Sequence, residues 1–327
     1  MQKTKWILFL CVAVLGCKNA TEPNTHVGNW ILNYSAQDGY FHGLSFPDKN
    51  HGWVVGDSGS ILRTSNAGNS WEVQESGIGS SLKCVYFANA SKGWIGGGEN
   101  SIGMTTNGGG SWSWQHPAGE PNRTFMGISF VDDSTGWIVD NYGGILHTEN
   151  GGISWTPQTS GTTWAITSVQ FLDANEGWAT ATNRLVLHTT NGGDEWSIIA
   201  LDSLDYGTTV VFNDIYFLNR SKAWIATTAG LNVEPHPAPI VASSDTGNTW
   251  SCQTTPEEMF ITSVVFLNES LGWATASAGI LNTTDGGVHW TYQLSLPSAL
   301  FVDLSLVDQS VCWALTFTGK IYRFEIS

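Results

Sequence analysis

Basic residues are scarce in this sequence. Lys and Arg together number 13 against 28 Asp and Glu, which gives a formal net charge of −15 at pH 7. Nucleic-acid binding draws most of its free energy from cations that displace counterions, so we expect no nucleic-acid partner. The acidic surface suits attraction of a basic protein, although negative charge also keeps an exported domain soluble.

Cysteine is also rare. Cys11 and Cys17 lie near the N-terminus, which leaves only Cys84, Cys252 and Cys312 in the rest of the chain. An odd number without paired spacing offers no disulfide framework. We therefore expect all three to be small buried hydrophobic residues.

Only one long apolar run occurs, at residues 6–15, and it is too short to span a bilayer. It follows Lys3 and Lys5, so residues 1–17 are predicted to be an export signal. The segment Val14-Leu15-Gly16-Cys17 resembles a bacterial lipobox. That resemblance implies a lipid on Cys17, a polar tether at residues 18–26, and a place in the envelope of a Gram-negative bacterium, with Lys18 favouring the outer membrane. The alternative is an ordinary secretory signal with an accidental cysteine.

One pattern, by contrast, occurs six times in the sequence: Ser/Thr-x-Asp/Asn-x-Gly-x-x-Trp. The Asp or Asn side chain can accept backbone N–H bonds and shape an Asx turn. The glycine supplies a positive φ, and the tryptophan leads into the next strand. We predict a β-hairpin connection at each copy, with Asn66, Asn107, Asn150, Asn191, Asp245 and Asp285 at the structural position.

A second marker, an apolar run followed by a short turn and usually Gly-Trp, occurs seven times. Its tryptophans are 40–49 residues apart: Trp53, Trp94, Trp137, Trp178, Trp224, Trp273 and Trp313. Each unit divides into four short strands, about 43–47, 52–56, 60–65 and 70–75 in the first unit, and no helical period appears. This predicts an all-β protein, a seven-bladed β-propeller of four-stranded antiparallel blades. A parallel β-helix has much shorter repeats.

The seventh unit ends without a hairpin box or a fourth strand. Trp30 lies one unit length before Trp71, and residues 28–33 resemble a fourth strand. We therefore predict that residues 28–34 complete the last blade and close the ring, so that residues 27–327 form one propeller.

The six boxes look like the Asp-box, or bacterial neuraminidase repeat. The longer unit, typified by residues 264–290, is similar to the propellers of the photosystem II assembly and stability factors. This resemblance covers all seven units and implies a non-catalytic module that binds a protein or assembles a complex. We expect a monomer whose partner is another envelope protein or protein complex. Sialidases and xyloglucanases also carry such boxes, so a glycan-binding or glycan-cleaving protein is the alternative.

The sequence shows no catalytic signature, and we expect no metal and no cofactor. One strand position near the box varies among the units: Arg63, Met104, His147, His188, Ala242, Asn282 and Arg323. We interpret it as a variable surface site, with a metal shared by the two histidines as the weaker alternative. A pair of loop carboxylates, as a glycosidase would require, stays open.

The longest connections are residues 200–213 and 227–240, which the propeller topology places side by side. They carry the candidate binding residues Asp202, Asp205, Tyr206, Glu234 and His236, and Phe125 and Trp164 extend this predicted surface. The alternative is that the prolines of the second connection merely stiffen an insertion without function.

One further apolar residue recurs in every unit, five positions before the last residue of the apolar run in the second marker: Phe41, Leu82, Phe125, Ile166, Phe212, Ile261 and Phe301. We interpret this ring as packing that closes the top of the channel.

Overall fold

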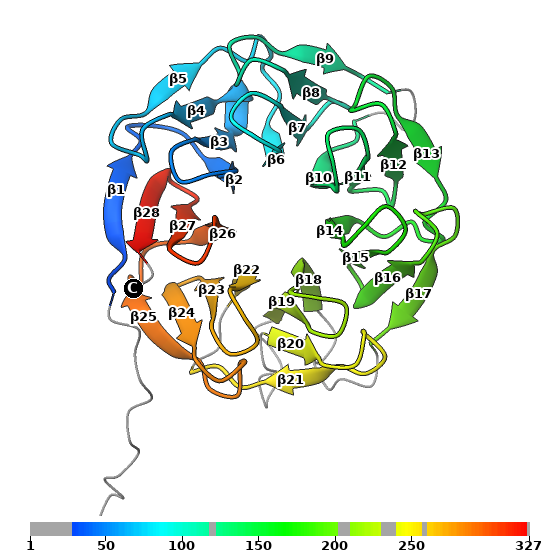
Figure 1. Ribbon diagram of the computed structural model, residues 1–327, viewed down its shortest axis with the longest axis vertical. Coiled ribbons are helices and arrows are strands. Elements are labelled where there is room, and N and C mark those ends of the chain that lie inside the picture. Colours follow the sequence, from blue (N-terminus) through cyan, green and yellow to red (C-terminus); the bar gives the residue numbers. More distant parts are fainter. Residues whose placement is uncertain (1–27, 118–121, 202–209, 230–239, 257–259, 326–327) are drawn as a thin grey trace, which may run out of the picture.

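The first strand of each repeat lies innermost and the fourth lies outermost, and seven such sheets surround a central channel (Figure 1). The computed structural model describes residues 28–117, 122–201, 210–229, 240–256 and 260–325. Each sheet has four antiparallel strands, so the predicted all-β, seven-bladed propeller is confirmed.

The blades follow the chain in order. Blade 1 contains β2 (Phe41–Ser45), β3 (Gly52–Gly56), β4 (Ile61–Thr64) and β5 (Glu72–Gln74); blade 2 contains β6 (Leu82–Phe87), β7 (Gly93–Gly97), β8 (Ile102–Thr105) and β9 (Ser113–Gln115). Blade 3 contains β10 (Phe125–Phe130), β11 (Gly136–Asp140), β12 (Ile145–Thr148) and β13 (Thr156–Gln158); blade 4 contains β14 (Ile166–Phe171), β15 (Gly177–Ala181), β16 (Leu185–Thr189) and β17 (Ser197–Ala200). Blade 5 contains β18 (Val210–Phe217), β19 (Ala223–Ala229), β20 (Ile240–Ser243) and β21 (Ser251–Gln253); blade 6 contains β22 (Ile261–Phe266), β23 (Gly272–Ala276), β24 (Gly279–Thr283) and β25 (Thr291–Ser295). Blade 7 contains β26 (Phe301–Leu306), β27 (Val311–Thr316) and β28 (Lys320–Glu325), together with β1 (Ile31–Ser35).

The ring is closed by the N-terminal strand, as predicted. Strand β1 pairs antiparallel with β28, 285 or more residues later in the chain, and supplies the outer edge of blade 7. The indole N–H of Trp30 donates to Gln293 Oε1 of blade 6 at 3.0 Å. The first and last segments are therefore joined by a backbone ladder and by a contact to the neighbouring blade.

The hairpin boxes have the predicted turn geometry. In blade 2 the Asn107 side chain accepts the N–H of Ser111 at 2.9 Å, and the Thr105 hydroxyl accepts the N–H of Gly109 at 2.9 Å. Gly108 has a φ of 68°, which glycine adopts without strain. Its N–H donates to Ser91 O in the turn between β6 and β7, so each box is tied to the inner turn of its own blade.

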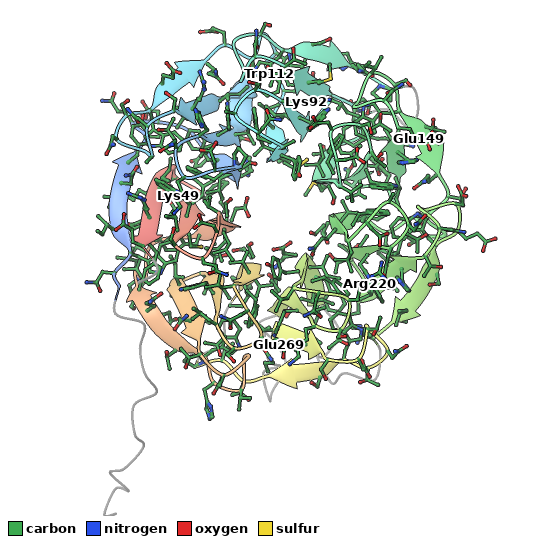
Figure 2. The ribbon with its side chains drawn as sticks, viewed as in Figure 1. Lys49, Lys92, Trp112, Glu149, Arg220 and Glu269 are labelled. Atoms are coloured by element: carbon green, nitrogen blue, oxygen red, sulfur yellow. The ribbon has the colours of Figure 1, made fainter. Side chains whose placement is uncertain are left out.

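The core lies between neighbouring blades. The tryptophan of each second strand is buried and stacks on a phenylalanine of the next blade in most cases, for example Trp53 on Phe87 at 3.5 Å and Trp137 on Phe171 at 3.4 Å between ring centroids. Polar bridges join the inner turns as well: Lys49 Nζ lies 3.3 Å from Asp308 Oδ2, and Lys222 Nζ lies 3.1 Å from Glu269 Oε2. Figure 2 labels one partner of each bridge, Lys49 and Glu269.

The structure refines three predictions. The seven recurring apolar residues are fully buried as packing, but they lie between blades and do not line the channel. The variable strand position is not a free surface site, because each of its residues pairs across the ladder with the tryptophan of the second strand, and the His188 ring stacks on Trp178 at 3.7 Å. Cys84 and Cys312 are buried as expected, whereas Cys252 is exposed, so that expectation is wrong for Cys252.

No helix in the described ranges is both long enough and apolar enough to cross a membrane.

Candidate functional site

Two kinds of connection lie on one face of the ring: those between the second and third strands of a blade, and those between successive blades. We call this the loop face. The hairpin boxes and the inner turns lie on the opposite face, which we call the box face. Because the boxes repeat closely and the loops do not, the loop face is where the blades differ.

Every innermost strand carries a β-bulge near its loop-face end. The bulged residues, one per blade, all line the channel: His42, Lys83, Met126, Thr167, Asn213, Thr262 and Val302. A bulge turns a side chain out of the regular alternation. The channel, of about 760 Å³, therefore carries the side chains of His42 and Lys83 at blades 1 and 2 and non-ionisable side chains at the other five blades at this level.

The basic pair is held by one carboxylate. Asp57 Oδ1 lies 2.8 Å from His42 Nε2 and 3.4 Å from Lys83 Nζ, and it also accepts the hydroxyl of Ser81. Burial alone would raise the pKa of Asp57, but hydrogen bonds from Ser81 and His42 and the charge of Lys83 together lower it to about 2. Burial lowers the pKa of His42, so its imidazole is mainly neutral at pH 7.

Apolar side chains adjoin this ionic cluster at blades 7 and 1. Tyr40 is 53% exposed and stacks on Phe317 at 4.6 Å, and the Phe317 ring lies 5.5 Å from that of His42. The N–H of Phe317 donates to the carbonyl of Leu300, a residue that is 42% exposed. We call Tyr40, His42, Asp57, Lys83, Leu300 and Phe317 the mouth patch. An aromatic centre with an ionic rim is the usual anatomy of a protein-binding surface.

Deeper in the channel wall, a belt of alternating serine and aspartate joins four blades: Ser168, Asp214, Ser263 and Asp303. Asp214 accepts the hydroxyls of Ser168 and Ser263, each at 2.9 Å, and Asp303 Oδ2 accepts the N–H of Leu44 at 2.9 Å. Burial raises the pKa of both carboxyls, that of Asp303 to about 7, with the charge of Asp214 contributing. Because their oxygens are engaged by the neighbouring blades, these acids serve inter-blade cohesion.

A separate pocket of about 610 Å³ lies on the loop face of blade 3. Two half-exposed aromatic side chains line it, Tyr142 at 49% and Trp164 at 51%. The third notable lining residue is Arg123, whose Nη1 lies 3.0 Å from Oδ2 of the fully buried Asp140. We call this the blade 3 pocket.

The predicted site residues have different outcomes. Asp202, Asp205, Tyr206, Glu234, His236 and the predicted anchor Cys17 lie outside the described residues. Trp164 lies exposed on the loop face. Phe125 is only 1% exposed, because it is the buried first residue of β10 and packs with Ile138 and Leu146, so it is unable to contact a partner and its assignment to the binding surface is corrected.

The mouth patch was not predicted from the sequence, although a signal for part of it was present. His42 and Lys83 each directly follow the recurring apolar residue that opens the first strand of a unit. Alignment of the seven units at that residue places the two basic side chains in adjacent blades. Within the described ranges, no three His, Cys, Asp or Glu residues are grouped so as to hold a metal ion.

The fold and its six boxes define the class: a single seven-bladed Asp-box propeller. The chain belongs to the family of the photosynthesis system II assembly factor YCF48, whose family model matches residues 23–117 and 113–253. A comparison with curated proteins finds no match.

Solved structures agree with the fold. YCF48 bound to a D1 peptide superimposes with a TM-score of 0.73 at 19% identity, covering 91% of this chain and 95% of that one. YCF48 from Cyanidioschyzon merolae gives 0.70 at 19% identity, with 91% and 99% covered. A catalytically inactive virginiamycin B lyase from Staphylococcus aureus gives 0.72 at 16% identity, with 92% and 99% covered. At these identities the neighbours establish the fold alone.

Proposed function

We propose that this protein is a non-catalytic scaffold that binds another protein through the mouth patch. The observation that carries the proposal is the exposed Tyr40, stacked on Phe317 beside His42 and the ion pair of Asp57 and Lys83. A rigid, partly exposed aromatic side chain loses little entropy on binding, and fixed charges at its edge set the orientation of a partner.

Family membership supports the same function. The chain belongs to an assembly-factor family, and a YCF48 structure contains a bound D1 peptide. A peptide or protein ligand is therefore the natural class of partner, and the acidic surface would favour one that presents basic residues around the contact.

Our proposal places the protein in the cell envelope, as a monomer attached by a lipid on Cys17. It rests on the lipobox pattern at residues 14–17, with residues 18–26 as the tether. Replacement Cys17→Ser should move the protein from the detergent phase to the aqueous phase on Triton X-114 partition. A variant that still enters the detergent phase would show that another anchor exists.

The binding surface is tested by quantitative capture from native membranes. The double variant Tyr40→Ala/Lys83→Ala should reduce recovery of the partner that the unmodified protein captures by about tenfold or more, because it removes the anchor and one of the rim charges. The control is Val288→Ala, which removes an exposed apolar side chain in a hairpin box on the opposite face. Equal capture by the double variant, with loss in the control, would place the interface on the box face.

A further inference from the structure

The loops of blades 1 and 3 on the loop face share one hydrogen-bonding frame. In blade 1 the N–H of Gly56 donates to Ser60 O, and in blade 3 the N–H of Asp140 donates to Gly144 O, each at 3.0 Å. The loops that leave these blades match too: the N–H of Ile78 donates to the Ser76 hydroxyl at 3.3 Å, and the N–H of Thr162 donates to the Ser160 hydroxyl at 3.2 Å. The repeat therefore provides an internal comparison for the blade 3 pocket.

At the two loop tips, small side chains are replaced by large aromatic ones, and the acidic residue also moves by one position, from Asp57 in blade 1 to Asp140 in blade 3. Tyr142 and Trp164 occupy the positions that Ser58 and Ser80 occupy in blade 1, with a local difference at Ser58, whose φ is 56°. Because the same frame forms with serine at both tips, the aromatic rings are not required to build it. Two large rings left half-exposed without a structural role indicate a ligand surface.

The rest of the pocket is polar but carries no net charge. Arg123 is balanced by the buried carboxylate of Asp140, which also accepts the N–H groups of Tyr142 and Gly144, each at 2.8 Å. The guanidinium is thus fixed in place and retains N–H donors beyond the single one directed at Asp140. The remaining lining groups include the amide of Gln158 and the hydroxyls of Thr159 and Thr162.

We propose that the blade 3 pocket binds a neutral saccharide built from pyranose rings of the gluco configuration. Such a ring has equatorial hydroxyls and two flat faces of C–H groups, so a face packs on an aromatic ring while the edge exchanges hydrogen bonds with amide, hydroxyl and guanidinium groups. An anionic sugar is disfavoured because Arg123 is already neutralised and the whole chain is acidic. This activity is additional to protein binding at the mouth patch.

The test is calorimetric titration with cellohexaose, a gluco-configured pyranose chain, and with a fructan hexasaccharide, a furanose chain of similar size. Cellohexaose should bind and the fructan should not. Replacements Trp164→Ser and Tyr142→Ser introduce the residues that blade 1 carries at these positions, and each should weaken cellohexaose binding at least tenfold without lowering Tm. Tyr40→Ser, in the mouth patch, is the matched control and should leave cellohexaose binding unchanged.

Absence of cellohexaose binding would overturn the proposal, as would equal binding of the fructan or binding that neither blade 3 variant alters. If Trp164→Ser instead reduces capture of the protein partner while cellohexaose does not bind, the pocket is part of the protein interface and the saccharide assignment is wrong. Loss of protein capture in the Tyr40 variants bears only on the mouth patch, so the two proposals fail separately.

Discussion

Blade 4 is joined to its two neighbours by different polar chemistry. Toward blade 3, the carbonyl of Gly192 in the blade 4 box accepts two side-chain donors of blade 3, Trp137 Nε1 at 3.0 Å and Gln158 Nε2 at 2.8 Å. Toward blade 5, Ile199 stands in the place of Gln158, and the indole N–H of Trp178 has no hydrogen-bond partner in the described structure. Both joints nevertheless stack an indole on the phenyl ring of the next blade.

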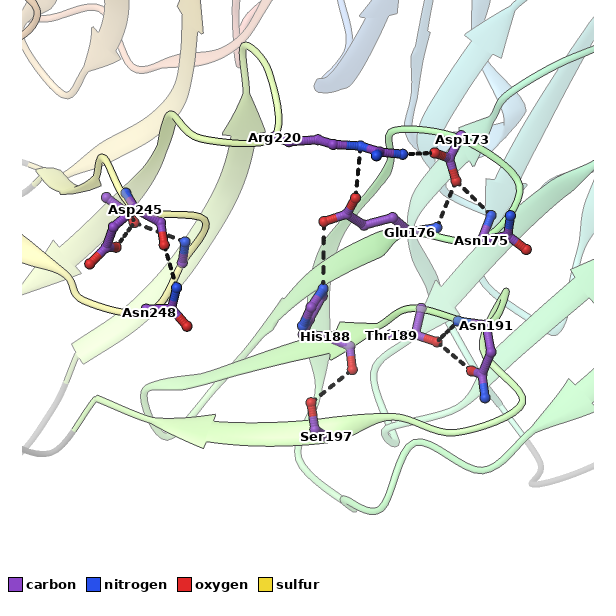
Figure 3. A network of polar contacts seen from close by, with 12 residues as sticks. Asp173, Asn175, Glu176, His188, Thr189, Asn191, Ser197, Arg220, Asp245 and Asn248 are labelled. Atoms are coloured by element: carbon purple, nitrogen blue, oxygen red, sulfur yellow. Dashed lines mark hydrogen bonds and ion pairs between the residues drawn. The ribbon is translucent and has the colours of Figure 1, made fainter.

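The joint between blades 4 and 5 replaces these neutral bonds with charge. Arg220 of blade 5 contacts Asp173 and places its Nε 3.0 Å from Glu176 Oε2, and Glu176 Oε1 lies 3.8 Å from His188 Nε2 (Figure 3). On the channel side of this joint, the Ser168 hydroxyl of blade 4 donates to Asp214 of blade 5. Gly127 of blade 3 stands at the position of Ser168, so the joint between blades 3 and 4 lacks this bond.

The comparison separates what the repeat requires from what it tolerates. Trp178 packs directly against Gly247, where an added Cβ would lie 2.4 Å from the indole, so the apolar contact fixes the approach of the blades. The polar ties around it differ between joints. We therefore expect stacking to dominate the free energy of unfolding, with neutral bonds next and exposed ion pairs last.

The largest effect is expected from the stacked tryptophans. Trp137→Ala and Trp178→Ala should each lower the free energy of unfolding by about 3–5 kcal/mol, because each leaves a cavity between blades. The pair Trp137→Phe and Trp178→Phe sharpens the comparison: only the first removes an indole hydrogen bond, so it should cost about 1 kcal/mol more. Equilibrium unfolding in urea measures both, and equal costs for the two phenylalanine variants would contradict the difference between the joints.

The second effect concerns Asp214, the buried carboxyl of the serine and aspartate belt at the joint between blades 4 and 5. Burial raises the pKa of Asp214 in the folded protein, so the stability that it contributes is full below its ordinary value of 3.8 and is lost as the pH rises through the folded pKa. Asp214→Asn should therefore be less stable than the unmodified protein by about 1–3 kcal/mol near pH 4, with a gap that narrows as the pH rises through the folded pKa of Asp214.

The control for Asp214 is Asp132→Asn. Hydrogen bonds from Ser134 and Thr135 lower the pKa of the exposed Asp132 to about 2, so this carboxyl is ionised in both folded and unfolded chains above about pH 5. Its stability gap should stay constant from there to pH 8. A gap for Asp214→Asn that is also constant, measured by Tm across this range, would show that Asp214 does not titrate as its burial requires.

The third effect is the neutral tie between blades 3 and 4. Gln158→Leu removes one donor from Gly192 O and should destabilise by about 1 kcal/mol, since the carbonyl keeps Trp137. The reciprocal change Ile199→Gln should not stabilise, because Gly247 O already accepts Trp250 Nε1 at 3.0 Å and Ile199 packs against the core between blades 4 and 5. Stabilisation by Ile199→Gln would show that the missing glutamine is a defect of this joint.

Most of the fold was predictable because the repeat expresses it in every unit. The Asp or Asn, Gly and Trp of the box predict a hairpin turn, and the length of the unit predicts four strands. The closing strand is predictable too, because Trp30 lies one unit length before Trp71. The hydrogen bonds that glutamine side chains make between blades were not predicted. Their sequence signal is a glutamine three residues after a box tryptophan, at Gln74, Gln115, Gln158, Gln253 and Gln293. Their role depends on contact between blades, which the spacing within one unit does not reveal.

The sites were less predictable, because they depend on which residues of different blades meet. Phe125 was predicted to extend the binding surface, but it is the first residue of β10 and its side chain is buried between blades. The mouth patch joins Tyr40 to Phe317, which are 277 positions apart, through closure of the ring. Trp164 was assigned to the binding surface from its place in the connection between two blades; its side chain is exposed, and its role in binding stays a prediction.

The smallest effect is expected at the ion pairs of Figure 3. Arg220 is 65% exposed, and exposed pairs contribute about 0–1 kcal/mol and are screened by salt. Arg220→Met should therefore lower Tm slightly in dilute buffer and leave it unchanged at high NaCl, whereas the loss in Gln158→Leu should not depend on salt.

The control Lys222→Met breaks a comparable pair to Glu269 in the next joint and should behave as Arg220→Met does. Glu176 is only 13% exposed. In the variant, His188 is the basic side chain that remains beside it in the described part of the chain, and that imidazole carries little charge because burial lowers its pKa. If Arg220→Met instead costs more than about 2 kcal/mol at every salt concentration, the guanidinium compensates a buried carboxylate, and the two joints of blade 4 are equally dependent on their polar ties.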